Sequence, residues 1–129
     1  MIYLDASAAL AHLMAEDRRP PASLWDEVLV ASRLLDYEVW TVVHARGLGD
    51  SHEEATTSLL GRVAFLEMIP EILHRARQPF PTPVRTLDAL HLASLEFLRS
   101  QGQTTRLASY DRRMLDAAAA LRVDVLPLD

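Results

Sequence analysis

Four acidic residues, Asp5, Glu38, Asp88 and Asp111, occupy positions where a carboxylate could do chemistry. Asp5 ends the apolar run Ile2-Tyr3-Leu4, and Asp111 follows a second apolar run. Like charges gathered within ~3–6 Å repel one another and raise each other's pKa unless a cation neutralises them. Because every donor is an oxygen, we expect a hard ion, Mg²⁺ or Mn²⁺. One or two such ions would position and deprotonate a water and would stabilise the phosphorane charge of an in-line attack.

Each acid also has an ordinary structural explanation. Asp5 and Asp111 could cap the helices that follow them, and Asp88 falls in a first helical turn, where the helix dipole favours an acid. Glu38 is harder to explain, because it lies in the middle of an apolar helix stripe and an unpaired buried carboxylate costs several kcal/mol. Its neighbours one turn away are Leu34, Leu35, Thr41 and Val42. The alternative to a metal is pairing with an arginine.

Helices and strands alternate along the chain and can bring these acids together. We expect strands at 2–4, 28–31, 63–69, 107–109 and 123–126, and helices at 8–16, 21–27, 32–46, 53–60, 70–77, 86–102 and 111–122. Few tight hairpin signals separate the strands, so we predict an α/β fold: one domain over 1–129 with a parallel sheet of about five strands and helices on both faces. Ligands of such sheets bind beyond the carboxyl ends of the strands.

The composition removes several classes of protein. There is no lysine, so neither a P-loop nor an acidic phospho-transfer site of the receiver or haloacid-dehalogenase type can be built. There is no cysteine, which excludes disulfides and thiolate zinc sites. The net charge of −5 argues mildly against binding nucleic acid through charge alone, but divalent cations between carboxylates and phosphates would permit it.

All 13 basic residues are arginines, which pair with phosphate in a bidentate fork. Arg112 and Arg113 stand at the positive end of a helix dipole, where an acidic cluster or an RNA phosphate would stabilise them. A GC-rich coding bias is the alternative explanation for the excess of arginine. His91, one turn after Asp88, is expected to be a satisfied or surface histidine rather than a metal ligand.

Nothing in the sequence indicates a membrane or export. No apolar run approaches the ~20 residues that span a bilayer, and no basic segment precedes an apolar stretch at the N-terminus. We therefore expect a cytoplasmic protein, which the absence of cysteine also fits.

Four motifs occur in the order and spacing of the PIN-domain nucleases, and the resemblance covers essentially the whole chain. They are Asp5-Ala6-Ser7-Ala8, Ser32 with Glu38 six residues on, Arg85-Thr86-Leu87-Asp88-Ala89-Leu90-His91-Leu92-Ala93, and Ser109-Tyr110-Asp111-Arg112-Arg113. Within that family the chain most resembles the VapC toxins of bacterial type II toxin–antitoxin modules. A degenerate PIN-like domain that binds without cutting, and an acidic-site phosphatase for small substrates, are the two alternatives.

The resemblance implies a divalent-metal-dependent endoribonuclease that hydrolyses RNA. Asp5, Glu38, Asp88 and Asp111 would be the catalytic, metal-binding acids, with Ser7 and Ser109 as supporting hydroxyls. Arg85, Arg112 and Arg113 would contact RNA. The resemblance also implies a homodimer and a small antitoxin protein that folds onto grooves between the early helices.

One apolar face could form such a groove or could simply be core. It comprises Ala8, Ala9, His12, Leu13, Leu59 and Leu60.

Overall fold

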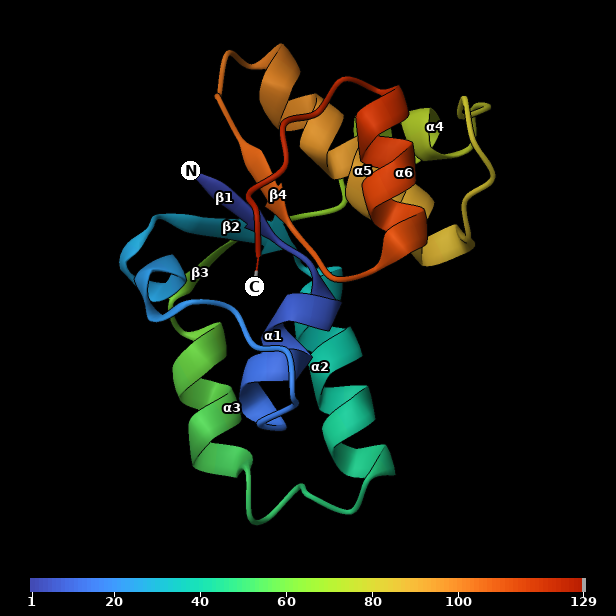
Figure 1. Ribbon diagram of the computed structural model, residues 1–129. Coiled ribbons are helices and arrows are strands. Elements are labelled where there is room, and N and C mark those ends of the chain that lie inside the picture. The colour runs from blue at the N-terminus through green and yellow to red at the C-terminus, as the bar shows by residue number, and fades with distance from the viewer. Residues whose placement is uncertain (129) are drawn as a thin grey trace.

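The computed structural model describes residues 1–128 as alternating strands and helices (Figure 1). They are β1 (Ile2–Leu4), α1 (Ala6–Leu13), the 3-10 helix η1 (Ala22–Asp26), β2 (Leu29–Ser32), α2 (Leu34–Ala45), α3 (Glu53–Leu60), β3 (Val63–Leu66), α4 (Pro70–Ala76), α5 (Thr86–Ser100), β4 (Arg106–Ala108) and α6 (Arg112–Ala120). Within these residues the strands form one parallel sheet in the order β3-β2-β1-β4. The predicted α/β class and parallel sheet are confirmed.

Strand β1 lies at the centre of this sheet and determines where the carboxyl edge falls. Its register places Leu4 beside Ala108 of β4, so that Asp5 and Ser109 leave the sheet side by side. All residues of β1 and β2 are buried. Because parallel ladders need crossover connections, the helices between these strands must pack on the faces of the sheet.

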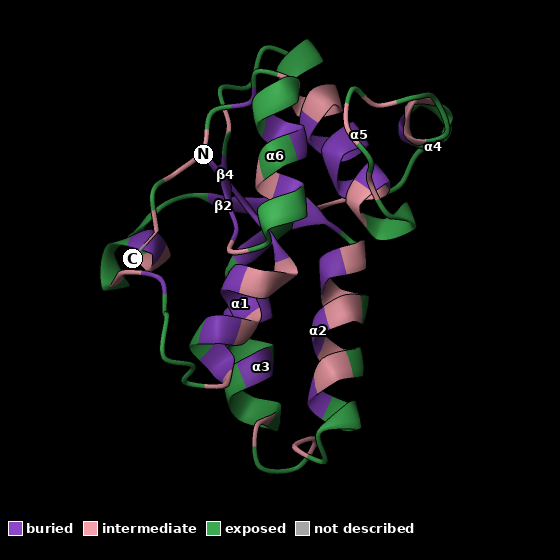
Figure 2. Ribbon diagram, turned by 45° about the vertical axis from the view of Figure 1, so that its right-hand side comes forward, coloured by how far each residue is buried: buried purple, intermediate pink, exposed green. Residues whose placement is uncertain are grey.

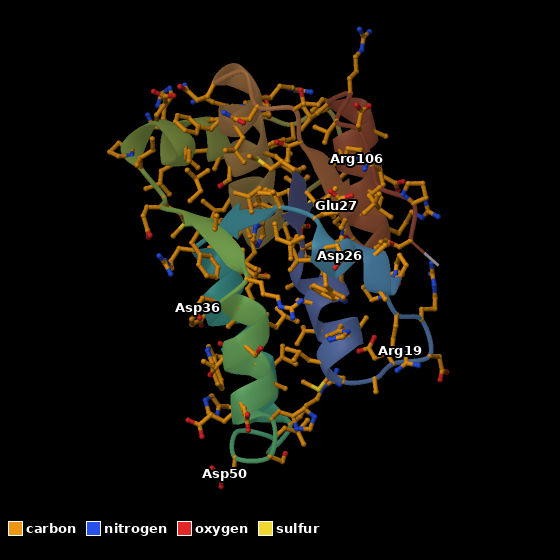
Figure 3. The ribbon with its side chains drawn as sticks, turned by 90° about the vertical axis from the view of Figure 1, so that its left-hand side faces the viewer. Arg19, Asp26, Glu27, Asp36, Asp50 and Arg106 are labelled. Carbon is orange, nitrogen blue, oxygen red and sulfur yellow. The ribbon has the colours of Figure 1, made fainter. Side chains whose placement is uncertain are left out.

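The helices cover both faces, as expected. Figure 1 shows α1, α2 and α3 grouped on one side of the sheet and α4, α5 and α6 on the other. In Figure 2 the purple, buried side of α1, α2, α5 and α6 faces inward, while green residues lie outside. Charged side chains such as Asp36 and Asp50 lie at the periphery (Figure 3). Within residues 1–128, no helix is long and apolar enough to cross a membrane.

The predicted fifth strand, 123–126, is reduced to a single bridge. Leu107 pairs with Val125 in parallel, and the Leu107 N–H donates to the Asp124 carbonyl at 2.9 Å. The Leu126 N–H in turn donates to the Leu107 carbonyl at 2.9 Å, and β4 itself ends at the next residue, Ala108.

Helix starts differ slightly from those expected at two of the acids. Asp5 and Asp111 are the N-cap residues, so α1 begins at Ala6 and α6 at Arg112. The expected start of this first helix at residue 8 is wrong, because Ser7 lies inside α1. Its hydroxyl is used by Asp5.

The apolar face of α1 and α3 is mostly core. Ala8, Ala9, Leu13, Leu59 and Leu60 are all buried in the main cluster. His12 is exposed, and it lines a hollow of about 390 Å³ with Trp25 and residues of α3. The interpretation of the whole face as an open groove is therefore wrong.

Candidate active site

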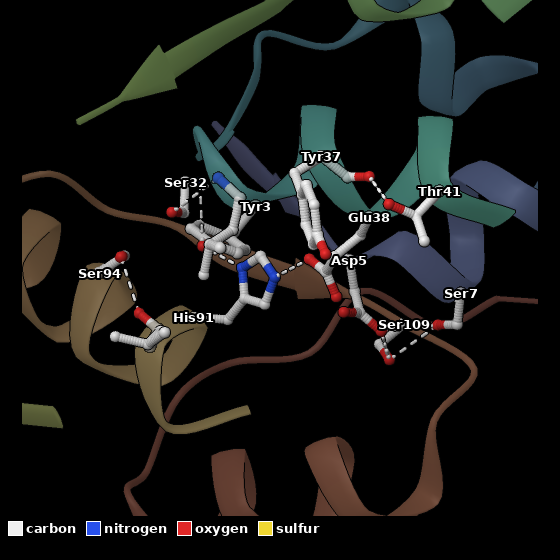
Figure 4. A network of polar contacts seen from close by, with 12 residues as sticks. Tyr3, Asp5, Ser7, Ser32, Tyr37, Glu38, Thr41, His91, Ser94 and Ser109 are labelled. Carbon is white, nitrogen blue, oxygen red and sulfur yellow. Dashed lines mark hydrogen bonds and ion pairs between the residues drawn. The ribbon is translucent and has the colours of Figure 1, made fainter. Parts of the chain in front are cut away.

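Asp5 is held at the carboxyl end of β1 by two hydroxyl groups. Its Oδ2 atom accepts hydrogen bonds from the Oγ atoms of Ser7 and Ser109, each at 2.7 Å (Figure 4). The side chain is only 6% exposed. Although Asp5 is the N-cap residue of α1, its carboxylate makes no capping hydrogen bond. The capping explanation is therefore wrong for Asp5, and its role must be sought in the site.

The same two serines hold the loop that follows β4 beside the carboxyl end of β1. Ser7 Oγ accepts from the Tyr110 N–H at 2.9 Å, and Ser109 Oγ accepts from the Asp111 N–H at 3.0 Å. The hydroxyls lie 3.1 Å apart. One acid therefore organises the backbone that presents another, Asp111.

Asp111 lies at the exposed start of α6 and caps it. Its Oδ1 atom accepts from the backbone N–H groups of Arg113 at 3.0 Å and Met114 at 3.4 Å. The capping explanation is thus correct for Asp111. It does not exclude a second role, because this cap uses one carboxylate oxygen and leaves Oδ2 available.

Glu38 on α2 contacts a histidine, not an arginine. The Nε2 atom of His91 hydrogen-bonds to Glu38 Oε1, and His91 Nδ1 lies 2.7 Å from the hydroxyl of Tyr3. His91 is buried, with partners on both ring nitrogens, so the expectation of a satisfied histidine is confirmed. Pairing with an arginine, the alternative raised for Glu38, is wrong.

Asp88 is half-buried in the first turn of α5. Its Oδ2 atom accepts from the Arg85 N–H at 3.2 Å. Burial raises the pKa of Asp88, and the negative charges of Asp111 and Asp5 raise this pKa further, against the opposing hydrogen bond from Arg85. Asp88 therefore lies within electrostatic range of two of the other acids.

Electrostatics also connect Glu38 to this group. Burial opposes protonation of His91, but the hydrogen bond and charge of Glu38 and the charge of Asp5 outweigh it, so the pKa of His91 is raised. Figure 4 shows Asp5 between the Glu38–His91 pair and Ser109. The four acids thus share one negative environment at the carboxyl edge of the sheet.

Every one of the four carboxylates uses one oxygen within the protein and leaves the other without a hydrogen-bond partner among residues 1–128. The engaged atoms are Asp5 Oδ2, Glu38 Oε1, Asp88 Oδ2 and Asp111 Oδ1. A carboxylate that is fixed at one oxygen and open at the other is suited to bind a cation or an ordered water.

This donor set fits a hard divalent ion. In the part of the chain that is described, no three acidic or histidine side chains stand close enough to enclose one ion directly. Mg²⁺ does not require such a cage, because it usually keeps several waters and takes one or two carboxylates together with substrate phosphates. Carboxylate oxygens without thiolates or free imidazoles fit Mg²⁺ or Mn²⁺.

Three arginines lie beside this edge. Arg85, Arg112 and Arg113 line one hollow of about 650 Å³ together with Asp111. Arg112 lies 3.8 Å from Asp116, one turn further along α6. The Oγ1 atom of Thr82, which also lines this hollow, is buried and has no partner among residues 1–128. The hollow thus combines positive charge with an unused hydroxyl.

Tyr3, and the part that His91 takes in the site, were not predicted from the sequence. The available signal was Tyr3 itself, because a tyrosine inside a fully buried strand must find a partner for its hydroxyl. His91 is that partner, and the Tyr3 oxygen also accepts a hydrogen bond from the Ser32 N–H at 3.0 Å. Burial raises the pKa of the Tyr3 hydroxyl, which therefore stays protonated.

Comparison with known proteins agrees with the fold. Residues 2–120 match the PIN domain family, and the chain belongs to that family. The protein named Ribonuclease VapC46 of Mycobacterium tuberculosis (strain ATCC 25618 / H37Rv) is 32% identical over 131 residues, covering 97% of this chain and 95% of the relative. Ribonuclease VapC35 of the same strain is 29% identical over 130 residues, covering 98% and 96%. The predicted PIN-domain resemblance is confirmed.

Proposed function

We propose that this protein is a divalent-metal-dependent endoribonuclease and the toxin of a VapBC-type toxin–antitoxin pair. The observation that carries the proposal is the set Asp5, Glu38, Asp88 and Asp111, each fixed at one carboxylate oxygen and open at the other. Its full-length similarity to proteins named VapC ribonucleases supports RNA as the substrate.

The four acids would hold Mg²⁺ or Mn²⁺ at the carboxyl edge, directly or through waters. The bound ion would supply a water of lowered pKa and would offset the charge that develops on the phosphate. Asp5 contributes a carboxylate whose orientation is fixed by Ser7 and Ser109, and Glu38 contributes one whose Oε1 atom is hydrogen-bonded to His91. The protein's own contribution is thus the fixed geometry of oxygen donors around the reacting phosphate.

The hollow that contains Arg85, Arg112 and Arg113 would bind the RNA backbone next to the site. Guanidinium groups pair with phosphate in a bidentate manner, and Asp111 connects this hollow to the acidic edge. Arginines that bind phosphate, next to carboxylates that bind a divalent cation, would explain how a protein of net charge −5 engages RNA.

A small antitoxin, a homodimeric state and a cytoplasmic location complete the proposal. They rest on the likeness to VapC proteins, and the antitoxin is expected to keep the nuclease inactive until it is removed.

Substrate class is the first thing to test. The purified chain, incubated with Mn²⁺, should cleave structured RNA internally and should leave a nucleoside monophosphate intact. Release of phosphate from the monophosphate without cleavage of RNA would favour the acidic-site phosphatase. Binding of RNA without turnover of either substrate would favour the degenerate PIN-like domain.

A further inference from the structure

A chain of hydrogen bonds runs from the backbone of β2 to the carboxylate of Glu38 (Figure 4). The Ser32 N–H donates to the Tyr3 oxygen at 3.0 Å, and this oxygen lies 2.7 Å from His91 Nδ1. The other ring nitrogen, Nε2, contacts Glu38 Oε1. Glu38 is therefore tied through two side chains to the centre of the sheet.

The two connecting side chains are locked in place. Tyr3 is 0% exposed and His91 1% exposed, and their rings meet edge to face at a centroid distance of 5.7 Å. A half-turn of the imidazole would replace both nitrogens with carbons and would lose both hydrogen bonds. The environment therefore selects one ring orientation, with Nε2 toward Glu38.

Nε2 carries a proton in either charge state of the ring. In the neutral form, a proton on Nδ1 would leave the lone pair of Nε2 facing the Glu38 carboxylate, so the proton belongs on Nε2 and the Tyr3 O–H donates to Nδ1. In the imidazolium form, both nitrogens are protonated. In each case the N–H donates to Oε1, so Oε2 is the oxygen of Glu38 that stays open.

We propose that His91 and Tyr3 are positioning residues that fix the Glu38 carboxylate for metal binding. The inference rests on the proposed function, because Glu38 must be a metal-binding acid for its orientation to matter. Hydrogen bonds to ligating carboxylates orient them and tune the metal, and their loss costs roughly 10–100-fold in metal affinity or activity.

Helix α5 thereby serves the site twice. It carries Asp88 in its first turn, and three residues later it carries His91, which reaches across to α2. The relative placement of two acids from different helices is thus set by one side chain of α5.

The test compares two substitutions of His91. His91→Leu fills the buried space with an apolar side chain and removes the N–H that donates to Glu38. His91→Gln instead offers an amide NH₂ group as the donor. Calorimetric titration of the metal-free proteins with Mn²⁺ should show roughly tenfold or greater loss of affinity for His91→Leu, and a smaller loss for His91→Gln. For RNA cleavage by His91→Leu, the fold decrease in kcat should be larger than the fold increase in KM.

Tyr3→Phe provides a second test of the positioning role, because it removes the hydroxyl that contacts His91 and keeps the buried ring. It should weaken Mn²⁺ binding less than His91→Leu does. Thr56→Val is the matched control: Thr56 is buried on α3, outside the site, and its Oγ1 has no partner among residues 1–128. This control should bind Mn²⁺ as the wild type does.

Wild-type Mn²⁺ affinity in both His91→Leu and Tyr3→Phe would overturn the inference. Equal loss in His91→Leu and His91→Gln would also overturn it, because the donor would then not be the cause. Glu38→Gln distinguishes failure of the metal-site assignment from failure of the positioning role. If this variant binds Mn²⁺ as tightly as the wild type, the metal-site assignment itself fails. If only the His91 and Tyr3 variants behave as wild type, the proposed function stands and the positioning role does not.

Discussion

The Oδ2 atom of Asp5 lies 2.7 Å from the Oγ atom of Ser109, a residue 104 positions later in the chain. This hydrogen bond joins the carboxyl ends of the neighbouring strands β1 and β4. Through the Asp111 N–H, which donates to the same Oγ atom, it also sets the start of α6. The relationship shows how a parallel sheet brings distant acids to one edge.

Replacing this hydroxyl should loosen both strands at the site. Ser109→Ala leaves the Asp111 N–H without its acceptor and Asp5 with one hydroxyl. Hydrogen bonds to charged groups contribute about 1.5–3 kcal/mol, so the free energy of unfolding should fall by about that amount. RNA cleavage should fall by roughly 10–100-fold. Thermal unfolding and cleavage rates measure the two effects.

Ser51→Ala is the control for this variant, because Ser51 is exposed in the connector between α2 and α3 and its hydroxyl contacts Leu48 and His52 there. It should leave both quantities near the wild-type values. A Ser109→Ala protein with full activity would mean that Asp5 does not depend on this hydroxyl for its position.

Arginines of the hollow beside Asp111 should act on RNA binding rather than on the chemical step. Arg85→Ala and Arg113→Ala should each raise KM and should each flatten the dependence of log affinity on log salt by about one unit or less. The control is Arg106→Ala, since Arg106 is exposed at the opposite end of β4 (Figure 3). Equal weakening by all three substitutions would contradict a local RNA path.

The raised pKa of Asp88 predicts how the stability of the metal-free protein depends on pH. With the folded-state pKa above the unfolded value, folding takes up a proton, so stability should increase as pH falls from neutral through the folded pKa. Below the unfolded value the gain is complete. Asp88→Asn should be more stable than the wild type at neutral pH and should flatten the gain.

Melting curves in EDTA across this pH range test the expectation. Asp50→Asn, which removes an exposed carboxylate at the far end of the molecule, should follow the wild-type curve (Figure 3). An Asp88→Asn protein less stable than wild type at every pH would mean that the hydrogen bond from Arg85 outweighs repulsion among the acids.

Expression of the chain without its antitoxin should arrest bacterial growth through loss of translation. The reason is the proposed cleavage of RNA, which Asp5→Asn should abolish without altering the fold. Growth curves at equal expression levels make the comparison. Arrest that persists with Asp5→Asn would point to a cause other than nuclease activity.

The sequence was sufficient to predict most of the fold. Apolar runs and breaks located β1 to β4, and α3 was predicted with the observed bounds at Glu53 and Leu60. The predicted strand at 123–126 was too long, because hydropathy marks the segment as apolar but does not show that only Val125 forms a bridge, to Leu107 of β4.

The site was harder to predict, because its details depend on contacts between distant residues. The four candidate acids were proposed from their apolar surroundings and from the order of the motifs, and their role stays a prediction. The partner of Glu38 was not, since 53 positions separate it from His91 and no local spacing connects them. Whether an N-cap aspartate uses its side chain as a cap was equally open: Asp111 does, and Asp5 does not.

Cleavage of RNA by the wild type and four single variants, with Mn²⁺ or with excess EDTA, tests the central claim most directly. The variants are Asp5→Asn, Glu38→Gln, Asp88→Asn and Asp111→Asn. We expect cleavage by the wild type with Mn²⁺, none in EDTA, and a loss of orders of magnitude in each variant, because each removes metal-binding charge. Full cleavage in excess EDTA, or wild-type rates in two of the four variants, would contradict the account.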